Sequence, residues 1–378
     1  MKLPIESLVI RRFRGVRELE LSGLGRINLF VGPNNSGKTS VLEAVATFAN
    51  PLSPLEWIET VRRRDLLAPR AALIDGIKWL APIEKPANGG AFSGTTEVLG
   101  EGAYRVARST AKITEIEEII DRKDDLARPE TDSPLLSGDA GPEKGISLDL
   151  TATTRGEPDL FGAASAATET AHFELWESTR GRIPRNADAA SLPCATVTSS
   201  GHRSEHTAVI EAYSEVVLHG KADEVTDLIR IFDPSVRALD IVKPRLGAPY
   251  LAVRHAALGT VPLHLFGDGM RRALYLGAML STARGGVLLV DEIETAIHVS
   301  ALERTFDWLV RAAGEMDVQV FATTHSLEAV DALLGANEPD DSLVLHRLER
   351  RDPVTFVKRL SGDRLQRLRS ELGQEIRG

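Results

Sequence analysis

The sequence predicts an α/β protein in which a mostly parallel sheet is flanked by helices, and three observations support this prediction. A strand-like stretch over residues 26–31 runs through a glycine-rich loop into an apolar-periodic helix over residues 41–49. An apolar stretch over residues 287–290 ends in two carboxylates, and a similar stretch follows over residues 318–324 after an intervening helical pattern. Strands that alternate with helices in this way form parallel sheets that are covered on both faces.

The composition is that of a globular protein. The chain has 378 residues, of which 43% are hydrophobic and 26% charged, enough for one large or two modest cores. No apolar run approaches the about 20 residues of a membrane span, and Glu6 interrupts the opening segment, so we expect a cytoplasmic protein without an integral membrane partner. Cys194 is the only cysteine, and the net charge of −9 argues against a broadly basic nucleic-acid-binding surface.

The element pattern divides the chain into two expected units. Residues 1–50 and 190–378 form a discontinuous core, which contains helical patterns near 206–217, 221–232 and 299–313 and from residue 327, and strands near 236–242 and 250–255. Residues 51–189 form a mixed α+β insertion with antiparallel strands and several prolines. Its segment 121–145 is polar, bears proline and glycine, and is expected to be a flexible loop.

The glycine-rich loop fits the phosphate-binding pattern G-x-x-x-x-G-K-[ST] at every fixed position. Its glycines let backbone N–H groups and the start of the following helix face an anion. Lys38 is expected to reach the β- and γ-phosphates, and Thr39 to place its hydroxyl on Mg²⁺. The predicted nucleoside-triphosphate site comprises Gly32, Pro33, Asn34, Asn35, Ser36, Gly37, Lys38, Thr39 and Ser40.

Two carboxylates follow the apolar strand 287–290, at the edge of a parallel sheet where ligands bind. Asp291 is expected to hold Mg²⁺, and Glu292 to orient and deprotonate the attacking water. His325 follows the next strand, a position that resembles that of the H-loop histidine of ABC ATPases, and this resemblance implies a contact with the γ-phosphate and that water. We therefore assign catalytic roles to Lys38, Glu292 and His325.

A glycine turn precedes a helix about 20 residues before Asp291. Such a turn exposes N–H groups and the positive end of the helix dipole, which suits a phosphate. The expected ligand-binding residues of this turn are Gly267, Asp268, Gly269, Met270 and Arg271. Arg271 and Arg272 would oppose the dipole unless an anion lies nearby, and the alternative is a solvated pair.

Taken in order, GPNNSGKT, FGDGMRRAL, VLLVDEIETAIH and FATTHS resemble the motifs of ABC-type ATPases, and among these P-loop NTPases the OLD-family and SMC-like group. The resemblance covers residues 1–50 and 190–335. It implies an ABC-like head with an N-terminal antiparallel hairpin layer, ATP and Mg²⁺ as cofactors, and a head-to-tail homodimer. Each ATP would lie between the phosphate loop of one subunit and the glycine turn, or signature turn, of the other. Within the first hairpin, Arg12 or Arg14 either approaches the nucleotide or lies on the surface.

The chain departs from this pattern in several places. Gly267 replaces the usual signature serine, and no glutamine precedes Gln319, so the usual glutamine contact to Mg²⁺ is absent or replaced. Glu294 and His298 resemble the OLD-like version of the segment after Asp291, with a helix-entry acid and a surface histidine as the alternative. An acidic cluster near the C-terminus, comprising Glu338, Asp340 and Asp341, lies in a proline-bearing turn, so no Toprim nuclease is expected.

These features predict an ATPase that converts ATP and water to ADP and phosphate. The resemblance implies that a dimer couples the nucleotide state to a separate effector, such as a nuclease, or to DNA or RNA, in bacterial anti-phage defence. The alternative is an ATP-dependent sensor or scaffold with little intrinsic hydrolysis, which the missing glutamine and Gly267 favour. A transporter subunit fits the signature turn poorly, and a GTPase lacks the N-K-x-D pattern.

Overall fold

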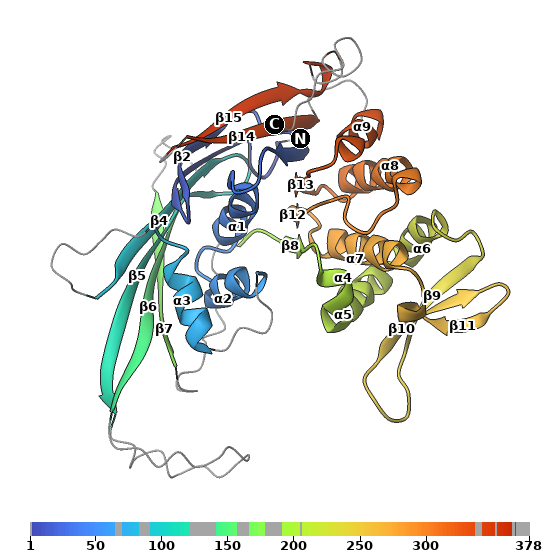
Figure 1. Ribbon diagram of the computed structural model, residues 1–378, viewed down its shortest axis with the longest axis horizontal. Helices are drawn as coiled ribbons and strands as arrows, with labels where there is room; N and C mark the ends of the chain where they lie inside the picture. The colour runs from blue at the N-terminus through green and yellow to red at the C-terminus, as the bar shows by residue number, and fades with distance from the viewer. Residues whose placement is uncertain are drawn as a thin grey trace.

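The computed structural model describes residues 2–64, 70–82, 91–120, 141–156, 166–177, 191–204, 206–336, 342–351, 354–364 and 367. They form an α/β fold in which an antiparallel sheet and a helical half lie on opposite sides of a central parallel sheet (Figure 1). The acidic cluster 338–341 lies outside the described residues. Within the described part of the chain, no helix is long and apolar enough to cross a membrane.

The central sheet has six strands in the order β15-β14-β3-β13-β12-β8. Its strands are β3 (Ile27–Val31), β8 (Cys194–Val197), β12 (Val287–Val290), β13 (Gln319–Thr323), β14 (Leu343–Arg351) and β15 (Val354–Ser361). All neighbours pair in parallel except β14 and β15. The predicted, mostly parallel sheet is therefore confirmed, and its carboxyl edge brings together the segments that follow β3, β12, β13 and β8.

Alternating residues of the central strands face two different cores. Leu288 and Val290 belong to the core on the helical side, whereas Val287 and Leu289 belong to the core on the other side. Every residue of β3, β12 and β13 is buried, as expected for parallel strands covered on both faces. This double burial holds the carboxyl ends of the strands in fixed positions.

The second sheet is antiparallel, with the order β2-β1-β4-β5-β6-β7. Its strands are β1 (Ser7–Phe13), β2 (Val16–Leu21), β4 (Ser93–Glu101), β5 (Val106–Ile120), β6 (Gly141–Thr154) and β7 (Ala167–Trp176). Helix α1 (Lys38–Ala49) packs against β12 and β13 as well as β1 and β4, so it lies between the two sheets. The pairing of β1 with β4 crosses the expected unit boundary at residue 50, and the division into units stays a prediction.

The segment between β3 and β8 contains helices that the sequence did not indicate, α2 (Pro54–Arg62) and α3 (Arg70–Lys78). Pro54 occupies the first turn of α2, a position where its missing N–H has no cost. One of the prolines that predicted loops in this segment, Pro54, therefore lies at the start of a helix. Of the expected loop 121–145, residues 121–140 lie outside the described residues, and residues 141–145 belong to β6.

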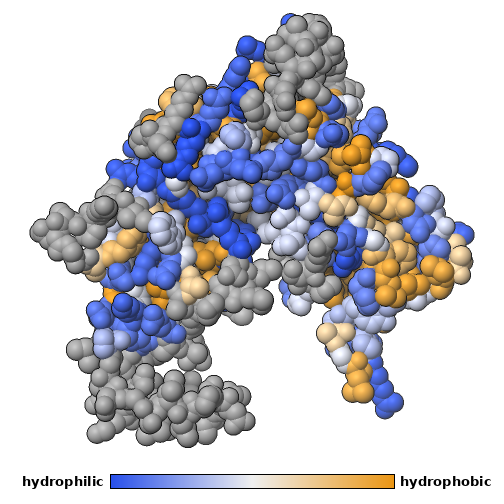
Figure 2. Space-filling model, in the orientation of Figure 1, coloured by the Kyte–Doolittle hydropathy of each residue, from blue (hydrophilic) through white to orange (hydrophobic). Residues whose placement is uncertain are grey.

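The helical half covers the other face of the parallel sheet. Its helices are α4 (Gly201–Ser204), α5 (His206–Leu218), α6 (Ala222–Arg230), α7 (Asp268–Thr282), α8 (Val299–Glu315) and α9 (Leu327–Ala336). A three-stranded sheet at its outer end comprises β9 (Val236–Val242), β10 (Tyr250–His255) and β11 (Gly259–Pro262), followed by the 3-10 helix η2 (Leu263–Leu265). Apolar residues gather on the surface of this half, whereas hydrophilic residues predominate in the middle of the same face (Figure 2).

Candidate active site

The phosphate loop joins β3 to α1, where the sequence predicted it. Gly32 has a φ of 144°, and a Cβ there would lie 2.4 Å from the carbonyl oxygen of Leu348, so a larger residue does not fit. Gly37 adopts a left-handed conformation with a φ of 98° and caps α1 without a side-chain hydrogen bond. The first N–H groups of an α-helix have no acceptor within the helix. The loop therefore presents donors to a bound anion.

The side chain of Lys38 folds back into this loop and is only 6% exposed. Its ammonium group donates to the carbonyl oxygens of Gly32, at 2.8 Å, and Pro33, at 3.0 Å. Burial lowers the pKa of Lys38, whereas nearby carboxylates, chiefly those of Asp291 and Glu292, act in the opposite direction. The ammonium group therefore lies in the electric field of the carboxylates that follow β12.

Asp291 connects the phosphate loop to the neighbouring strands. Its Oδ1 accepts a hydrogen bond of 3.2 Å from the hydroxyl of Thr39 and one of 2.7 Å from the hydroxyl of Thr323. Thr39 and Asp291, the two expected metal ligands, are 252 positions apart in the sequence and in contact in the fold. Thr323, which the sequence did not single out, ends β13 between β3 and β12.

Glu292 has a φ of 48°, a left-handed backbone that is uncommon for a residue with a side chain. Its N–H donates to the hydroxyl of Thr323 at 2.8 Å, and its carbonyl oxygen accepts from Arg272 at 3.1 Å. Its Oε2 accepts from the hydroxyl of Thr295 at 3.1 Å. This backbone conformation costs about 1–3 kcal/mol, and the hydrogen bonds on both sides of the residue compensate for that cost.

The turn that carries His325 is attached to the segment after β12. The carboxylate of Glu294 accepts from the N–H of His325 at 3.0 Å and from the hydroxyl of Thr324 at 2.7 Å. The side chain of His325 is exposed, as it must be to reach a ligand. His298 caps α8 by accepting a hydrogen bond of 3.3 Å from the N–H of Ser300.

The signature turn leads into α7, with Gly267 as the N-cap residue. Gly267 is exposed, and a Cβ there would meet no atom of the described residues within 4 Å. Met270 is 5% exposed and packs in the core, so only its backbone could face a ligand. Arg271 forms an ion pair with Asp268 one turn away, which offsets the repulsion between the arginine and the helix dipole.

Arg272 differs from the expected solvated or phosphate-facing residue, and that expectation is wrong. Its side chain is fully buried, with 0% exposed. The guanidinium group donates to the carbonyl oxygens of Thr198, of Asp291 at 3.0 Å and of Glu292 at 3.1 Å. Burial lowers the pKa of Arg272 to about 10, which leaves it charged at neutral pH. A cation so close to a glycine turn suggested an anion from the sequence, but three carbonyl oxygens satisfy it instead.

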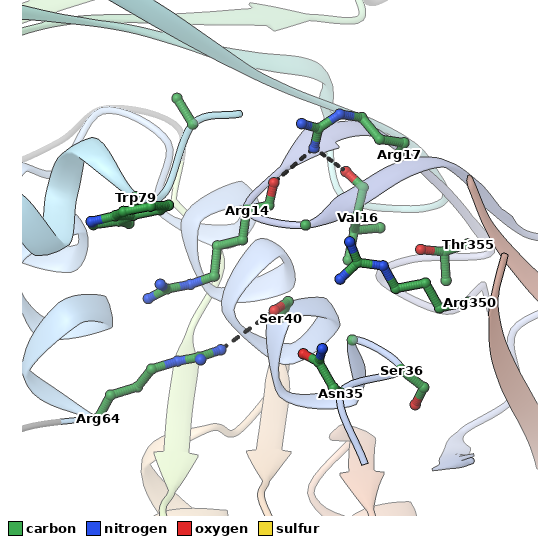
Figure 3. A pocket seen from close by; sticks show the side chains of 13 residues that line it. Arg14, Val16, Arg17, Asn35, Ser36, Ser40, Arg64, Trp79, Arg350 and Thr355 are labelled. Atoms are coloured by element: carbon green, nitrogen blue, oxygen red, sulfur yellow. Dashed lines mark hydrogen bonds between the residues drawn. The ribbon is translucent and has the colours of Figure 1, made fainter. Parts of the chain in front are cut away.

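A cavity of about 580 Å³ adjoins the outer side of the phosphate loop (Figure 3). Arg14 and Arg64 line it, and both bind the buried carboxylate of Glu43, with shortest distances of 2.5 and 2.6 Å. The same cavity is bordered by Ser40, whose hydroxyl lies 3.4 Å from Arg64. Of the two candidate arginines in the first hairpin, Arg12 is exposed, and Arg14 is the one that borders the cavity.

A second cavity, of about 330 Å³, is lined by Thr39 and Asp291. Its lining also includes hydroxyl side chains within and directly after β8, those of Thr196, Thr198, Ser199 and Ser200. Gln319 is remote from it, because its amide is buried and binds Ile5 and Gly25 near the N-terminus. Gln319 therefore has a structural role away from the candidate site. Several of the side chains that line this cavity together with Asp291 carry hydroxyl groups instead of a glutamine amide.

The donor set at this sheet edge fits a magnesium-bound triphosphate. The hydroxyl of Ser36 is buried in the phosphate loop and has no hydrogen-bond partner among the described residues, which leaves a donor for a phosphate oxygen. Lys38 supplies positive charge, and the adjacent Thr39 and Asp291 supply the hard oxygen ligands that Mg²⁺ prefers. Together these residues can bind a nucleotide and its metal.

Several known proteins are similar to this chain. The uncharacterized protein MJECL11 of Methanocaldococcus jannaschii is 34% identical over 115 residues, which are 30% of this chain and 99% of that protein. An ATP/GTP phosphatase of Helicobacter pylori is 21% identical over 355 residues, 87% of each chain. A solved SMC head, bound to the C-winged helix domain of ScpA, is 14% identical with a TM-score of 0.49 and is matched over 94% of this chain and 97% of its own. The family model described as "AAA domain, putative AbiEii toxin, Type IV TA system" matches residues 27–331, and the chain belongs to that family.

Proposed function

We propose that the chain binds ATP and hydrolyses it to ADP and phosphate at the carboxyl edge of the parallel sheet. The observation that carries the proposal is the contact between Thr39 of the phosphate loop and Asp291 after β12. Lys38 and the unpartnered hydroxyl of Ser36 lie in the same loop. A purely structural loop would not require a buried ammonium group or a buried hydroxyl without a partner.

The residues divide the reaction between them. The loop N–H groups and Lys38 bind the phosphates and neutralise charge that develops on the γ-phosphate. Glu292 orients a water molecule and accepts its proton as the water oxygen bonds to phosphorus and the bond to the β-phosphate oxygen breaks. His325, on the turn held by Glu294, donates a hydrogen bond to the transferred phosphate. Thr39 and Asp291 would hold Mg²⁺, which would neutralise charge on the phosphates.

The signature turn supports a shared site in a head-to-tail homodimer. Gly267 is exposed at the N-cap of α7, and the start of this helix offers N–H groups and a positive dipole end. These donors suit the γ-phosphate held by a second copy, as the resemblance to ABC-type ATPases implies. Each dimer would then bind two ATP molecules, each between two subunits.

The biological output that we propose is control of a separate effector, such as a nuclease, or of DNA or RNA, in bacterial anti-phage defence. The description of the matching family includes a toxin and a toxin–antitoxin system, which fits a defence role. A second candidate is a sensor with little intrinsic hydrolysis. It is favoured by the absence of glutamine before Gln319 and by hydroxyl side chains beside Asp291 instead.

The test combines binding and turnover. Calorimetric titration of wild-type protein with ATP and Mg²⁺ should show binding that Lys38→Ala abolishes, with Lys78→Ala, on α3, as the matched control. Retention of normal affinity by Lys38→Ala would contradict the assignment of the loop. Wild-type turnover well below about one per minute, against typical enzyme rates of 1–10³ s⁻¹, would favour the sensor.

A further inference from the structure

Two segments of the same chain that the shared-site proposal assigns to different ATP molecules are joined by one buried side chain. Arg272 lies in the first turns of α7, directly after the signature turn. Its guanidinium group donates to the backbone of Asp291 and Glu292, which follow β12. In a head-to-tail dimer the signature turn belongs to one ATP site, whereas Glu292 belongs to the other.

The contact is rigid because the arginine has no freedom to move away from it. Its side chain is fully buried, and its remaining acceptor is the carbonyl oxygen of Thr198, after β8. Withdrawal would leave carbonyl oxygens and a cation without partners inside the core, which is a costly state. A rotation or shift of α7 must therefore displace the backbone at Glu292.

The segment after β12, which Arg272 contacts, has two residues in left-handed conformations, Glu292 with a φ of 48° and Ala296 with a φ of 64°. Helix α7 contacts this segment near both of these residues. Arg272 binds the carbonyl oxygen of Glu292, and a Cβ on Gly269 would lie 3.1 Å from the carbonyl oxygen of Ala296. Strained backbone of this kind persists only where its surroundings impose it, so its conformation depends on where α7 lies.

We propose that Arg272 is a positioning residue that makes the two ATP sites of the dimer act together. When the signature turn of a subunit binds the γ-phosphate held by its partner, α7 takes a fixed position. Arg272 then holds the backbone of Glu292 in place in the subunit's own site. Hydrolysis at either site then depends on ATP at both. This inference rests on the proposed shared-site ATPase and adds a coupling that sharing alone does not require.

The first experiment measures how hydrolysis depends on ATP concentration. Wild type should show a Hill coefficient above 1, towards the limit of two sites. Arg272→Met should lower kcat by about 10²-fold, the effect of a small misplacement of a catalytic group, while ATP affinity changes little and the Hill coefficient falls to about 1. Arg272→Lys should recover part of kcat, and Arg284→Met, exposed beyond the end of the same helix, should behave as wild type.

The outcomes separate the inference from the function on which it rests. Wild type that binds no ATP or hydrolyses none contradicts the proposed function. Wild type that hydrolyses cooperatively, together with a folded Arg272→Met variant that keeps both the rate and the Hill coefficient, overturns the role of Arg272 alone.

A second experiment leaves Arg272 intact, in case its replacement prevents folding. Mixing Lys38→Ala with Gly267→Asp subunits creates heterodimers with one complete shared site, formed by the wild-type phosphate loop and the wild-type signature turn. In the subunit that holds ATP at this site, the signature turn is the mutated one. Coupling predicts that such heterodimers trap ATP but hydrolyse it well below half the wild-type rate. Hydrolysis at half the wild-type rate would show independent sites and overturn the inference.

Discussion

At the scale of single residues, Thr323 combines two functions that the sequence does not reveal. Its hydroxyl donates to Asp291 at 2.7 Å and accepts the N–H of Glu292 at 2.8 Å, and its side chain is 1% exposed. From the neighbouring strand it therefore fixes the carboxylate of Asp291 and the backbone of Glu292. A threonine at the end of a strand is ordinary in composition, and only the pairing of β12 with β13 gives this one its position.

Thr323→Val tests this arrangement, because valine keeps the shape and removes the hydroxyl. Loss of the acceptor leaves the N–H of Glu292 unsatisfied, which should lower the free energy of unfolding by about 1–3 kcal/mol. Turnover should fall more than ATP affinity, since Glu292 is displaced and the phosphate loop is unchanged. Denaturant titration and steady-state ATPase assays measure both effects, with Thr323→Ser as the control that keeps the hydroxyl. A valine variant with wild-type kcat would show that Glu292 needs no support from β13.

At the scale of elements, the start of α7 has room for the serine that the signature turn lacks. Gly267 has a φ of −63° and a ψ of 156°, which any residue adopts, and in the part of the chain that the structure describes no atom lies within 4 Å of a Cβ there. Serine is also a better N-cap residue than glycine, by a few tenths of a kcal/mol. We expect Gly267→Ser to stabilise the fold slightly and to raise kcat by adding a hydroxyl near the γ-phosphate. Gly314→Ser, in α8 with equally open space, is the control, and a kcat unchanged by Gly267→Ser would argue against a phosphate at this turn.

Strand β14 carries a buried histidine that makes stability depend on pH. His346 is 1% exposed and stacks on Phe30 with ring centroids 5.2 Å apart, and within the described ranges neither of its ring nitrogens has a hydrogen-bond partner. Burial lowers its pKa from 6.5 to about 3. Between these values the unfolded chain binds the proton and the folded chain does not, so stability falls as the pH drops below 6.5.

His346→Phe should remove this dependence. Each pH unit below the unfolded pKa costs the wild type about 1.4 kcal/mol from this residue. The phenylalanine variant should therefore match or exceed wild-type stability near neutral pH and should lose less on acidification. Denaturant unfolding at pH 7.5 and 5.0 gives the comparison. An equal loss in both proteins would mean that His346 is protonated in the folded state or that other groups dominate.

The sequence predicted the elements with strong local signals and missed those that depend on distant partners. Apolar stretches before the phosphate loop and before Asp291 are recognisable alone, because parallel strands are buried on both faces. Helix α2 was missed because proline at a helix start resembles proline in a loop. Arg272 was misjudged because charged residues are seldom fully buried, and nothing local shows that three carbonyl oxygens surround it.

At the scale of the whole molecule, the exposed apolar residues near the signature turn bear on assembly. Leu265 is 68% exposed immediately before the turn, and Val299 is 61% exposed at the start of α8, after the segment that carries Glu292. In a head-to-tail dimer, the signature turn contacts the partner's phosphate and its surroundings become interface. Aliphatic side chains in such an interface contribute to binding when they lose contact with water. ATP would supply the remaining attraction, because its phosphates bind donors from both subunits.

Assembly should therefore require ATP and should become visible when hydrolysis is blocked. In Glu292→Gln the side chain keeps its size but cannot accept the proton of the attacking water, so ATP is bound and retained. With ATP and Mg²⁺, size-exclusion chromatography with light scattering should give twice the mass of the chain for this variant. Without nucleotide it should give one chain, as should the double variant with Lys38→Ala under both conditions. Glu303→Gln, exposed on α8, controls for the loss of one charge and should behave as wild type. A Glu292→Gln protein that binds ATP in calorimetry yet stays at the mass of one chain would contradict a site shared between subunits, because its phosphate loop would then hold ATP without a partner's signature turn.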